Sequence, residues 1–286
     1  MAAQGAVGGG AHLPELVIEG TRSPTTRAAL AELWLHRGLV LAFAIRDVKV
    51  KYKQAILGVA WAVVQPLGLL VLFTLLVARA VTIRETDVPY PAFALSALIP
   101  WLFLQNAVVA GTGALLADSA LVRKIYFPRE APILGAVMAT AIEFWIGVGL
   151  YLALAPFVGA RLGPTAILVV PLFVLCALLA AGVSVALGAL NVYYRDVRYV
   201  LPFAVQLWMF ASPVVYPLST VPPRWRVLYV TLNPAAGLLD AFGRSLASGM
   251  PPEPMLLGLS TVTTVAVGWI GYRLFKWLEP AFADVI

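Results

Sequence analysis

From residue 55 onward, long runs of apolar residues alternate with short clusters of charged residues. A helix rises about 1.5 Å per residue, so roughly 20 apolar residues are long enough to cross the hydrocarbon core of a bilayer. The pattern therefore predicts an all-α integral membrane protein with six transmembrane helices. Residues 1–26 lack such a pattern and are expected to form a flexible tail before a membrane domain at residues 27–286. The predicted spans cover residues 55–78, 90–117, 131–158, 164–192, 199–218 and 254–274.

Two other segments carry apolar residues without forming a clean crossing. Over residues 30–53, apolar residues such as Trp34, Leu41 and Ile45 recur at spacings of three, four and seven and form one helical stripe. We expect an amphipathic helix in the membrane interface, although a basic flank before the first span would also explain the neighbouring cations. Residues 224–250 are too polar and too rich in Gly and Pro for a crossing, which favours an outer re-entrant or interfacial hairpin before the last span.

The distribution of positive charge predicts the orientation of the chain. Lys and Arg are enriched in the cytoplasmic loops of membrane proteins. With the N-terminus inside, 14 of the 20 Lys and Arg residues fall on the cytoplasmic side of the six predicted spans. We therefore predict a multi-pass protein of the cytoplasmic (inner) membrane with both termini in the cytoplasm.

The composition excludes a water-soluble globule. Hydrophobic residues make up 61% of the chain and charged residues 12%, whereas soluble domains average about 25% charged residues. The net charge of +6 is spread between the apolar runs and does not form the dense patch of a nucleic-acid-binding protein. The only cysteine, Cys176, lies inside an apolar run, which excludes an internal disulfide and a cysteine metal cluster.

The sequence lacks the motifs of common catalytic sites. No G-x-x-x-x-G-K-[ST] phosphate loop occurs, so the chain is not expected to hydrolyse ATP by itself. His12 and His36 are not accompanied by a cysteine or carboxylate cluster, which argues against a zinc site and against a Ser-His pair. We predict a protein without catalytic residues, metal or cofactor of its own. A membrane-embedded enzyme acting on lipid-linked sugars is the alternative.

Glu143 is the one acid in the middle of a predicted span. Burying a carboxylate at that depth costs about 3 kcal/mol or more unless it is paired or neutral. A functional role would make it a proton relay or a substrate contact. A structural role would pair it with a neighbouring helix through groups such as Gln65, Gln105 or Asn106. We favour the structural role, because a proton-coupled carrier normally shows more than one such group.

Aromatic residues are abundant in and around the predicted spans. Many are expected to anchor the protein at the two membrane interfaces. Those placed deeper could instead line a pathway for sugars, since an aromatic ring packs against the C–H face of a pyranose. The candidate lining residues are Trp61, Gln65, Trp101, Phe103, Tyr193, Tyr194, Phe203, Phe210 and Tyr216.

The loop over residues 118–130 is short and charged and also has an apolar side. A helix of one or two turns there could enter a groove on a cytoplasmic partner, or the loop could be an ordinary solvated connection. The residues assigned to a partner contact are Leu121, Arg123, Lys124, Ile125, Phe127, Pro128, Arg129 and Glu130.

Several segments occur in the order found in a known transporter family. They are Arg46-Asp47, Lys51-Tyr52-Lys53-Gln54, Leu57-Gly58, Trp61, Gln65-Pro66, Lys124 to Glu130, Asn191 to Val197, Ser212 to Pro217, Asn233-Pro234 with Arg244, and Phe282 to Ile286. Together they resemble the ABC-2 type permeases that export polysaccharides such as O-antigen, capsule, teichoic acid and cell-wall galactan. The resemblance covers roughly residues 30–286.

The resemblance implies a channel-forming permease subunit of an ATP-driven exporter of lipid-linked polysaccharide, with a type V exporter-like fold. It also implies a homodimer that binds two copies of a separate ATP-binding cassette subunit, which would hold ATP and Mg. Residues 30–53 would be the family's interface helix, and residues 118–130 its coupling helix. The cations expected to contact the polyprenyl-pyrophosphate headgroup are Arg46, Lys49, Lys51 and Lys53. An ABC-2 exporter of a drug or lipid is the main alternative.

Overall fold

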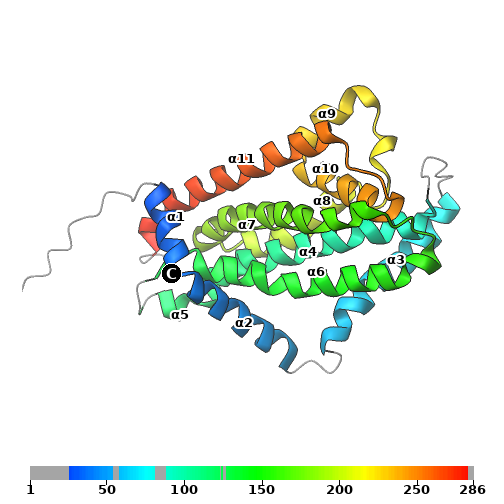
Figure 1. The fold of residues 1–286 in the computed structure, drawn as a ribbon. Helices are drawn as coiled ribbons and strands as arrows, with labels where there is room; N and C mark the ends of the chain where they lie inside the picture. Colours follow the sequence, from blue (N-terminus) through cyan, green and yellow to red (C-terminus); the bar gives the residue numbers. More distant parts are fainter. Residues whose placement is uncertain (1–25, 54–57, 81–87, 123, 125–126, 283–286) are drawn as a thin grey trace, which may run out of the picture.

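The computed structural model describes residues 26–53, 58–80, 88–122, 124 and 127–282, and the regular elements within these ranges are all helical (Figure 1). The predicted N-terminal tail therefore lies outside the described residues, except for its last position. The α-helices are α1 (Thr26–Leu35), α2 (Arg37–Lys53), α3 (Trp61–Ala80), α4 (Tyr90–Ala117), α5 (Ser119–Val122), α6 (Ala131–Val158), α7 (Val169–Tyr193), α8 (Val197–Phe210), α9 (Pro223–Leu232), α10 (Pro234–Phe242) and α11 (Pro254–Leu278). Shorter helical turns cover Gly58–Ala60, Pro164–Leu168, Leu218–Thr220, Gly243–Ser248 and Glu279–Ala281.

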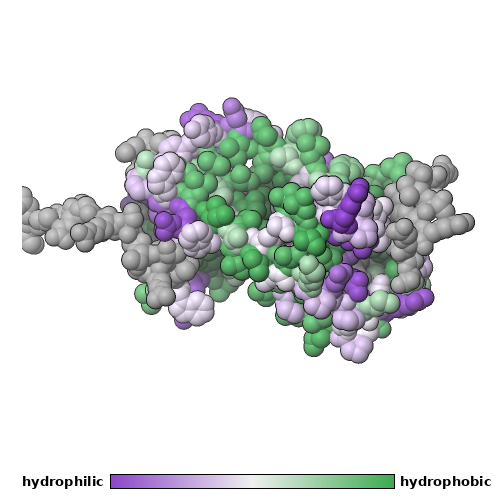
Figure 2. Space-filling model, turned by 90° about the horizontal axis from the view of Figure 1, so that it is seen from above, coloured by the Kyte–Doolittle hydropathy of each residue, from purple (hydrophilic) through white to green (hydrophobic). Residues whose placement is uncertain are grey.

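Long apolar helices form the body of the molecule. Among the described residues, the stretches that are long and apolar enough to cross a membrane are Tyr90–Leu121, Ala131–Val158, Pro164–Tyr193 and Pro254–Ala281. Their helices α4, α6, α7 and α11 run side by side in Figure 1. Figure 2 shows apolar residues gathered in the middle of one face and hydrophilic residues toward its two ends. This distribution is the one expected of a multi-pass membrane protein.

Helix α4 occupies the centre of the bundle. It packs against both α6 and α7 and is buried along most of its length. A helix that is apolar on all sides suits this position, because protein surrounds it. Helix α7 in turn crosses α11 closely, since a Cβ atom at Gly182 would lie only 2.6 Å from the Gly268 Cα atom. Small residues at such a crossing allow two membrane helices to approach one another.

Helix α8 is shorter than the span predicted over residues 199–218, since it ends at Phe210. Side chains of α9 and of Asn233, the residue after α9, form hydrogen bonds to the backbone at the C-terminal end of α8. Tyr229 Oη donates a hydrogen bond to the Ala211 carbonyl oxygen at 2.7 Å, and Asn233 Nδ2 donates to the same oxygen at 2.9 Å. Pro213 follows in the chain and has no N–H with which to continue the helix. The six-span count stays a prediction.

The region predicted as a re-entrant hairpin forms two short helices, α9 and α10, joined at Asn233. Figure 1 places them at the end of the bundle remote from α1 and α5. Helix α10 is almost entirely buried and contacts α4, α7 and α11. Its nine residues are continued by the six-residue π-helix Gly243–Ser248, and the two together are still shorter than the roughly 20 residues needed to cross a bilayer. Entry of this region into the membrane stays a prediction.

The interface helix predicted over residues 30–53 is divided into α1 and α2 at His36. Gly38 follows the break, and glycine lowers helix propensity by about 1 kcal/mol relative to alanine. Helix α2 packs against α6, its neighbour in Figure 1. The side of α2 that is buried differs from the predicted apolar stripe. The buried residues of α2 are Val40, Phe43 and Ala44, whereas Trp34, Leu41 and Ile45 of the predicted stripe are exposed. These three side chains are therefore free to contact lipid.

Candidate functional site

A cavity of about 530 Å³ lies between α2, α3, α4, α6 and α8. Amide side chains from three helices face it: Gln65 of α3, Gln105 and Asn106 of α4, and Gln206 of α8. Because polar side chains are costly among lipid tails, their convergence on one cavity indicates a site for polar groups. We name this site the polar groove, defined by Lys51, Trp61, Gln65, Gln105, Asn106, Glu143 and Gln206.

Glu143 is the centre of a hydrogen-bonded cluster at the wall of the polar groove. Tyr52 Oη donates to Glu143 Oε1 at 2.9 Å, and Asn106 Nδ2 donates to Glu143 Oε2 at 3.1 Å. Lys51 Nζ forms an ion pair with the same carboxylate. The predicted pairing of Glu143 with Asn106 is therefore confirmed. Burial and the hydrogen bond to Glu143 raise the pKa of Tyr52 above its usual range, which keeps its hydroxyl protonated as a donor.

Two predicted lining residues, Trp101 and Phe103, lie behind the groove. The Trp101 side chain is fully buried (0% exposed), and its Nε1 donates to Gln105 Oε1 at 3.1 Å. Phe103 is also buried, packs against Phe144 and Phe173, and borders only a small adjoining cavity of about 20 Å³. Both belong to α4, which other helices surround. The prediction is corrected accordingly: these rings support the groove rather than line it.

The other predicted lining residues fall in separate places. Trp61 and Gln65 line the polar groove, and the Trp61 side chain is 55% exposed. Phe203 and Phe210 are exposed on α8, next to the groove residues of that helix. The three tyrosines lie away from the groove. Tyr193 Oη donates to the Leu278 carbonyl oxygen, at the end of the bundle opposite α10, and the next residue, Tyr194, is exposed. Tyr216 Oη contacts Tyr229 Oη of α9.

The four cations predicted to bind a headgroup differ in their surroundings. Arg46 Nη1 and Nη2 donate to the two carboxylate oxygens of Asp118 at 2.6 and 2.7 Å, and Arg46 also pairs with Asp47. This fork geometry ties α2 to the end of α4, and Lys51 is tied to Glu143. Lys49 and Lys53 are exposed and make no ion pair within the described part of the chain.

The predicted coupling loop folds largely onto its own subunit. Phe127 and Pro128 are buried, and the Phe127 ring packs against Phe43 of α2. Leu121 and Lys124 are exposed, whereas Arg123 and Ile125 lie outside the described residues. Among the described residues assigned to the partner contact, Leu121 and Lys124 are therefore the ones available at the surface, at and just after the end of α5.

The end of the same loop is fixed to the C-terminal part of the chain. Arg129 Nη1 donates to the Glu279 carbonyl oxygen at 2.6 Å, and the buried Glu130 pairs with Lys276 Nζ at 2.6 Å. Lys276 also contacts the Glu279 carboxylate three residues later. The roles of Lys276 and Glu279, like those of Asp118 and Gln206, were not predicted from the sequence. The available signal was the presence of an amide inside an apolar span for Gln206, and the i,i+3 charge pair for Lys276.

Comparison with known proteins agrees with the resemblance. A model of the ABC-2 type transporter family matches residues 38–246, a range that contains every residue of the polar groove. The O-antigen export system permease protein RfbA of Myxococcus xanthus is 28% identical over 259 residues, which are 89% of this chain and 98% of that protein. A protein of the same name from Klebsiella pneumoniae is 20% identical over 87% of this chain and 95% of its own length. The polysialic acid transport protein KpsM of Escherichia coli is 24% identical over 85% and 94%, respectively.

Proposed function

Because the chain belongs to the ABC-2 type transporter family, we propose that it is the permease subunit of an ATP-driven exporter that moves lipid-linked polysaccharide across the cytoplasmic membrane. Relatives named for O-antigen export and polysialic acid transport support a polysaccharide as the cargo. The observation that carries the proposal is the polar groove, in which amides from three membrane helices and an exposed Trp61 face a cavity of about 530 Å³.

The chemistry of the polar groove suits a sugar chain. Glutamine and asparagine amides both donate and accept hydrogen bonds, so they satisfy hydroxyl groups in many orientations. Trp61 offers a ring face for the C–H surface of a pyranose. The one cation and the one anion of the groove, Lys51 and Glu143, neutralise each other. A moving glycan would therefore meet many weak contacts and no strongly charged trap.

A second copy of the chain would complete the pathway. The groove opens on the side where Trp61, Gln65 and Gln206 are exposed, and exposed aromatic residues of α8 border it. A two-fold symmetric pair of subunits would bury these apolar side chains and place two grooves face to face. We propose a homodimer of this kind as the working channel.

ATP-binding subunits would supply the driving force from the cytoplasmic side, where both termini would lie. ATP and Mg would be held by those subunits, and Leu121 and Lys124 would form part of their contact surface. A displacement there would reach the groove through two contacts of α2: the Arg46–Asp118 pair beside α5 and the Lys51–Glu143 pair at the groove wall. The unpaired Lys49 and Lys53 would bind the pyrophosphate of the lipid carrier.

The proposal is tested in cells and with purified protein. Loss of the chain should leave lipid-linked glycan inside the cell and none at the surface, and the wild-type chain should co-purify with an ATP-binding subunit. Stimulation of the partner ATPase by a drug or a phospholipid, but not by lipid-linked glycan, would favour the alternative cargo. Transport or modification of a solute by the purified chain alone in vesicles would contradict the proposal.

A further inference from the structure

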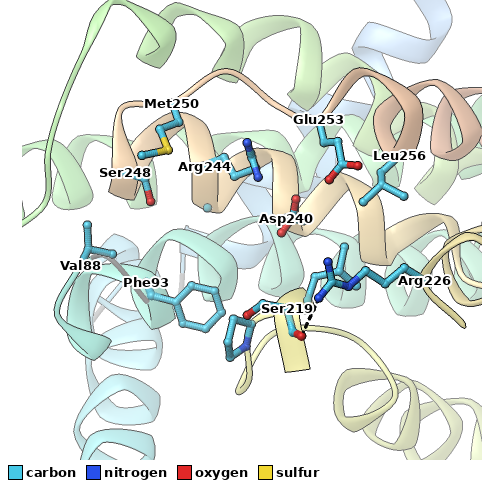
Figure 3. A pocket seen from close by; sticks show the side chains of 13 residues that line it. Val88, Phe93, Ser219, Arg226, Asp240, Arg244, Ser248, Met250, Glu253 and Leu256 are labelled. Carbon is cyan, nitrogen blue, oxygen red and sulfur yellow. Dashed lines mark hydrogen bonds between the residues drawn. The ribbon is translucent and has the colours of Figure 1, made fainter. Parts of the chain in front are cut away.

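A second polar cavity, of about 170 Å³, lies at the end of the bundle where α4 and α11 begin. Figure 3 shows side chains from α4, α9, α10, the turn after α10 and the start of α11 pointing into one space. We name this cavity the outer pocket, defined by Phe93, Ser219, Arg226, Asp240, Arg244 and Glu253. It shares no lining residue with the polar groove.

The outer pocket contains two acids and two arginines, so its formal charge is balanced. The arginines are held in place by backbone carbonyl oxygens. Arg226 Nε donates to Val221 and its Nη2 to Ser219, both at 2.8 Å, while Arg244 Nε donates to Pro251 at 3.0 Å. A guanidinium group has five N–H donors, so each arginine keeps donors for another acceptor.

Asp240 is a carboxylate without a close partner in this pocket. It lies four residues before Arg244, yet among the described residues no ion pair within 4 Å and no side-chain hydrogen bond involves it. Burial raises the pKa of Asp240 to about 6, with Arg244 and Arg226 opposing that rise and Glu253 adding to it. Asp240 is only partly exposed, and a ligand that donates hydrogen bonds would satisfy a carboxylate that has no close partner in the protein.

The mixture of groups selects the class of ligand. A metal cation would be opposed by two guanidinium groups, and an anion by two carboxylates. A neutral polyhydroxyl molecule can donate to Asp240 and Glu253 while it accepts from Arg226 and Arg244. The Phe93 ring adds an apolar surface of the kind that stacks on a pyranose. Drug-sized ligands occupy pockets of about 300–1,000 Å³, so this smaller cavity suits a single ring.

We propose that the outer pocket binds one neutral sugar residue of the glycan as it leaves the polar groove. This inference rests on the proposed function, which places polysaccharide in the groove and this end of the bundle outside the cell. A sugar ring held in the outer pocket would oppose backward movement of the glycan while the polar groove returns to its starting conformation. Because the pocket would bind one sugar ring at a time, its contact with the glycan would stay weak enough for the glycan to advance.

The site is tested by saturation-transfer NMR of the full chain, with its ATP-binding subunit if they co-purify, in lipid nanodiscs. The probes are glucose, galactose, mannose and rhamnose, with glucuronate as an anionic comparison. At least one neutral sugar should bind the wild type, and Asp240→Asn should weaken that binding about tenfold, as expected for loss of a hydrogen bond to a charged group. Arg224→Gln is the matched control, because Arg224 is exposed on α9 outside the pocket.

Glu253→Gln at an exposed position provides a second variant with the same expected direction, should Asp240→Asn fail to fold. Absence of binding by any neutral sugar, equal binding by wild type and the pocket variants, or binding of glucuronate alone would each overturn the site. The two proposals fail separately. If the protein exports glycan in cells but its sugar binding does not depend on Asp240, only the outer-pocket proposal is contradicted. If deletion of the protein leaves surface glycan unchanged, the proposed exporter function is contradicted.

Discussion

Two hollows of the helix bundle, which share no lining residue, differ in chemistry more than in size. The polar groove holds about 530 Å³ and is lined by four amides and an ion pair. The other hollow, between α7 and α11, holds about 300 Å³ and is lined mostly by apolar residues. We name it the apolar crevice, defined by Leu178, Gly182, Val185, Val265, Gly268 and Trp269. Glu130 also lines the crevice but is paired with Lys276, so lipid tails can fill this hollow, whereas the groove needs a polar occupant.

The largest expected effect is on stability at the apolar crevice. Gly182→Leu would force α7 away from α11, where the backbones are in contact, and should destabilise the protein by about 3 kcal/mol. Gly149→Leu on α6 is the control, because the space around Gly149 is open. Thermal unfolding in detergent measures both. Equal stability of the two variants would mean that the crevice is not a tight helix crossing.

Removal of Glu143 tests the structural cluster of the groove. Glu143→Leu leaves Lys51 and Tyr52 without an acceptor and should cost about 2 kcal/mol, less than a fully buried pair because Lys51 is half exposed. Glu143→Gln keeps a hydrogen-bond acceptor, so export should be largely retained. Unfolding and surface glycan are measured together. Complete loss of export in a normally folded Glu143→Gln protein would assign Glu143 a direct role in transport.

Placing an apolar residue in the polar groove and an amide in the apolar crevice tests whether the two hollows differ in function. Gln206→Leu removes one amide from the polar groove and should lower export about fivefold, as expected for one hydrogen bond of about 1 kcal/mol. Leu178→Gln places an amide in the apolar crevice and should leave export unchanged. The rate at which glycan appears at the cell surface is the measurement. An equal response of both variants would remove the functional distinction between the two hollows.

The smallest expected effect concerns the cations near the groove. Reversing the charge of both Lys49 and Lys53 should reduce stimulation of the partner ATPase by lipid-linked glycan about threefold, since each of two exposed, water-screened ion pairs contributes only about 0.3 kcal/mol. Arg195→Glu with Arg198→Glu is the control, because these exposed arginines lie outside the groove. An unchanged response of the Lys49 and Lys53 variant would remove their headgroup role.

The sequence pattern was most informative where a helix is long and uniformly apolar. The helices over residues 90–117 and 131–158 coincide with α4 and α6. The pattern could not separate Trp101 from Trp61, although the first is fully buried and the second is 55% exposed. Lipid tails and a protein core are equally apolar, so hydropathy does not tell which of them surrounds a side chain.

Contacts between distant parts of the chain were the other reason why the structure differs from the sequence-based predictions. Arg46 and Asp118 are 72 positions apart, and the end of α8 depends on Asn233, 23 positions after Phe210. Neither partner carries a local signal of the pairing. The amide groups of the polar groove were visible as isolated polar residues in apolar runs, but their convergence depends on how α3, α4 and α8 pack.

The length of α8 has a consequence for the surrounding bilayer. Its 14 residues rise about 21 Å, roughly 9 Å less than a hydrocarbon core of about 30 Å. As the crossing helix that the sequence predicts, α8 would require the lipids beside it to thin, and such a mismatch favours the association of helices over continued contact with lipid. Membrane thickness, and not only side-chain chemistry, therefore favours this side of the molecule for assembly, and thicker bilayers should strengthen the association.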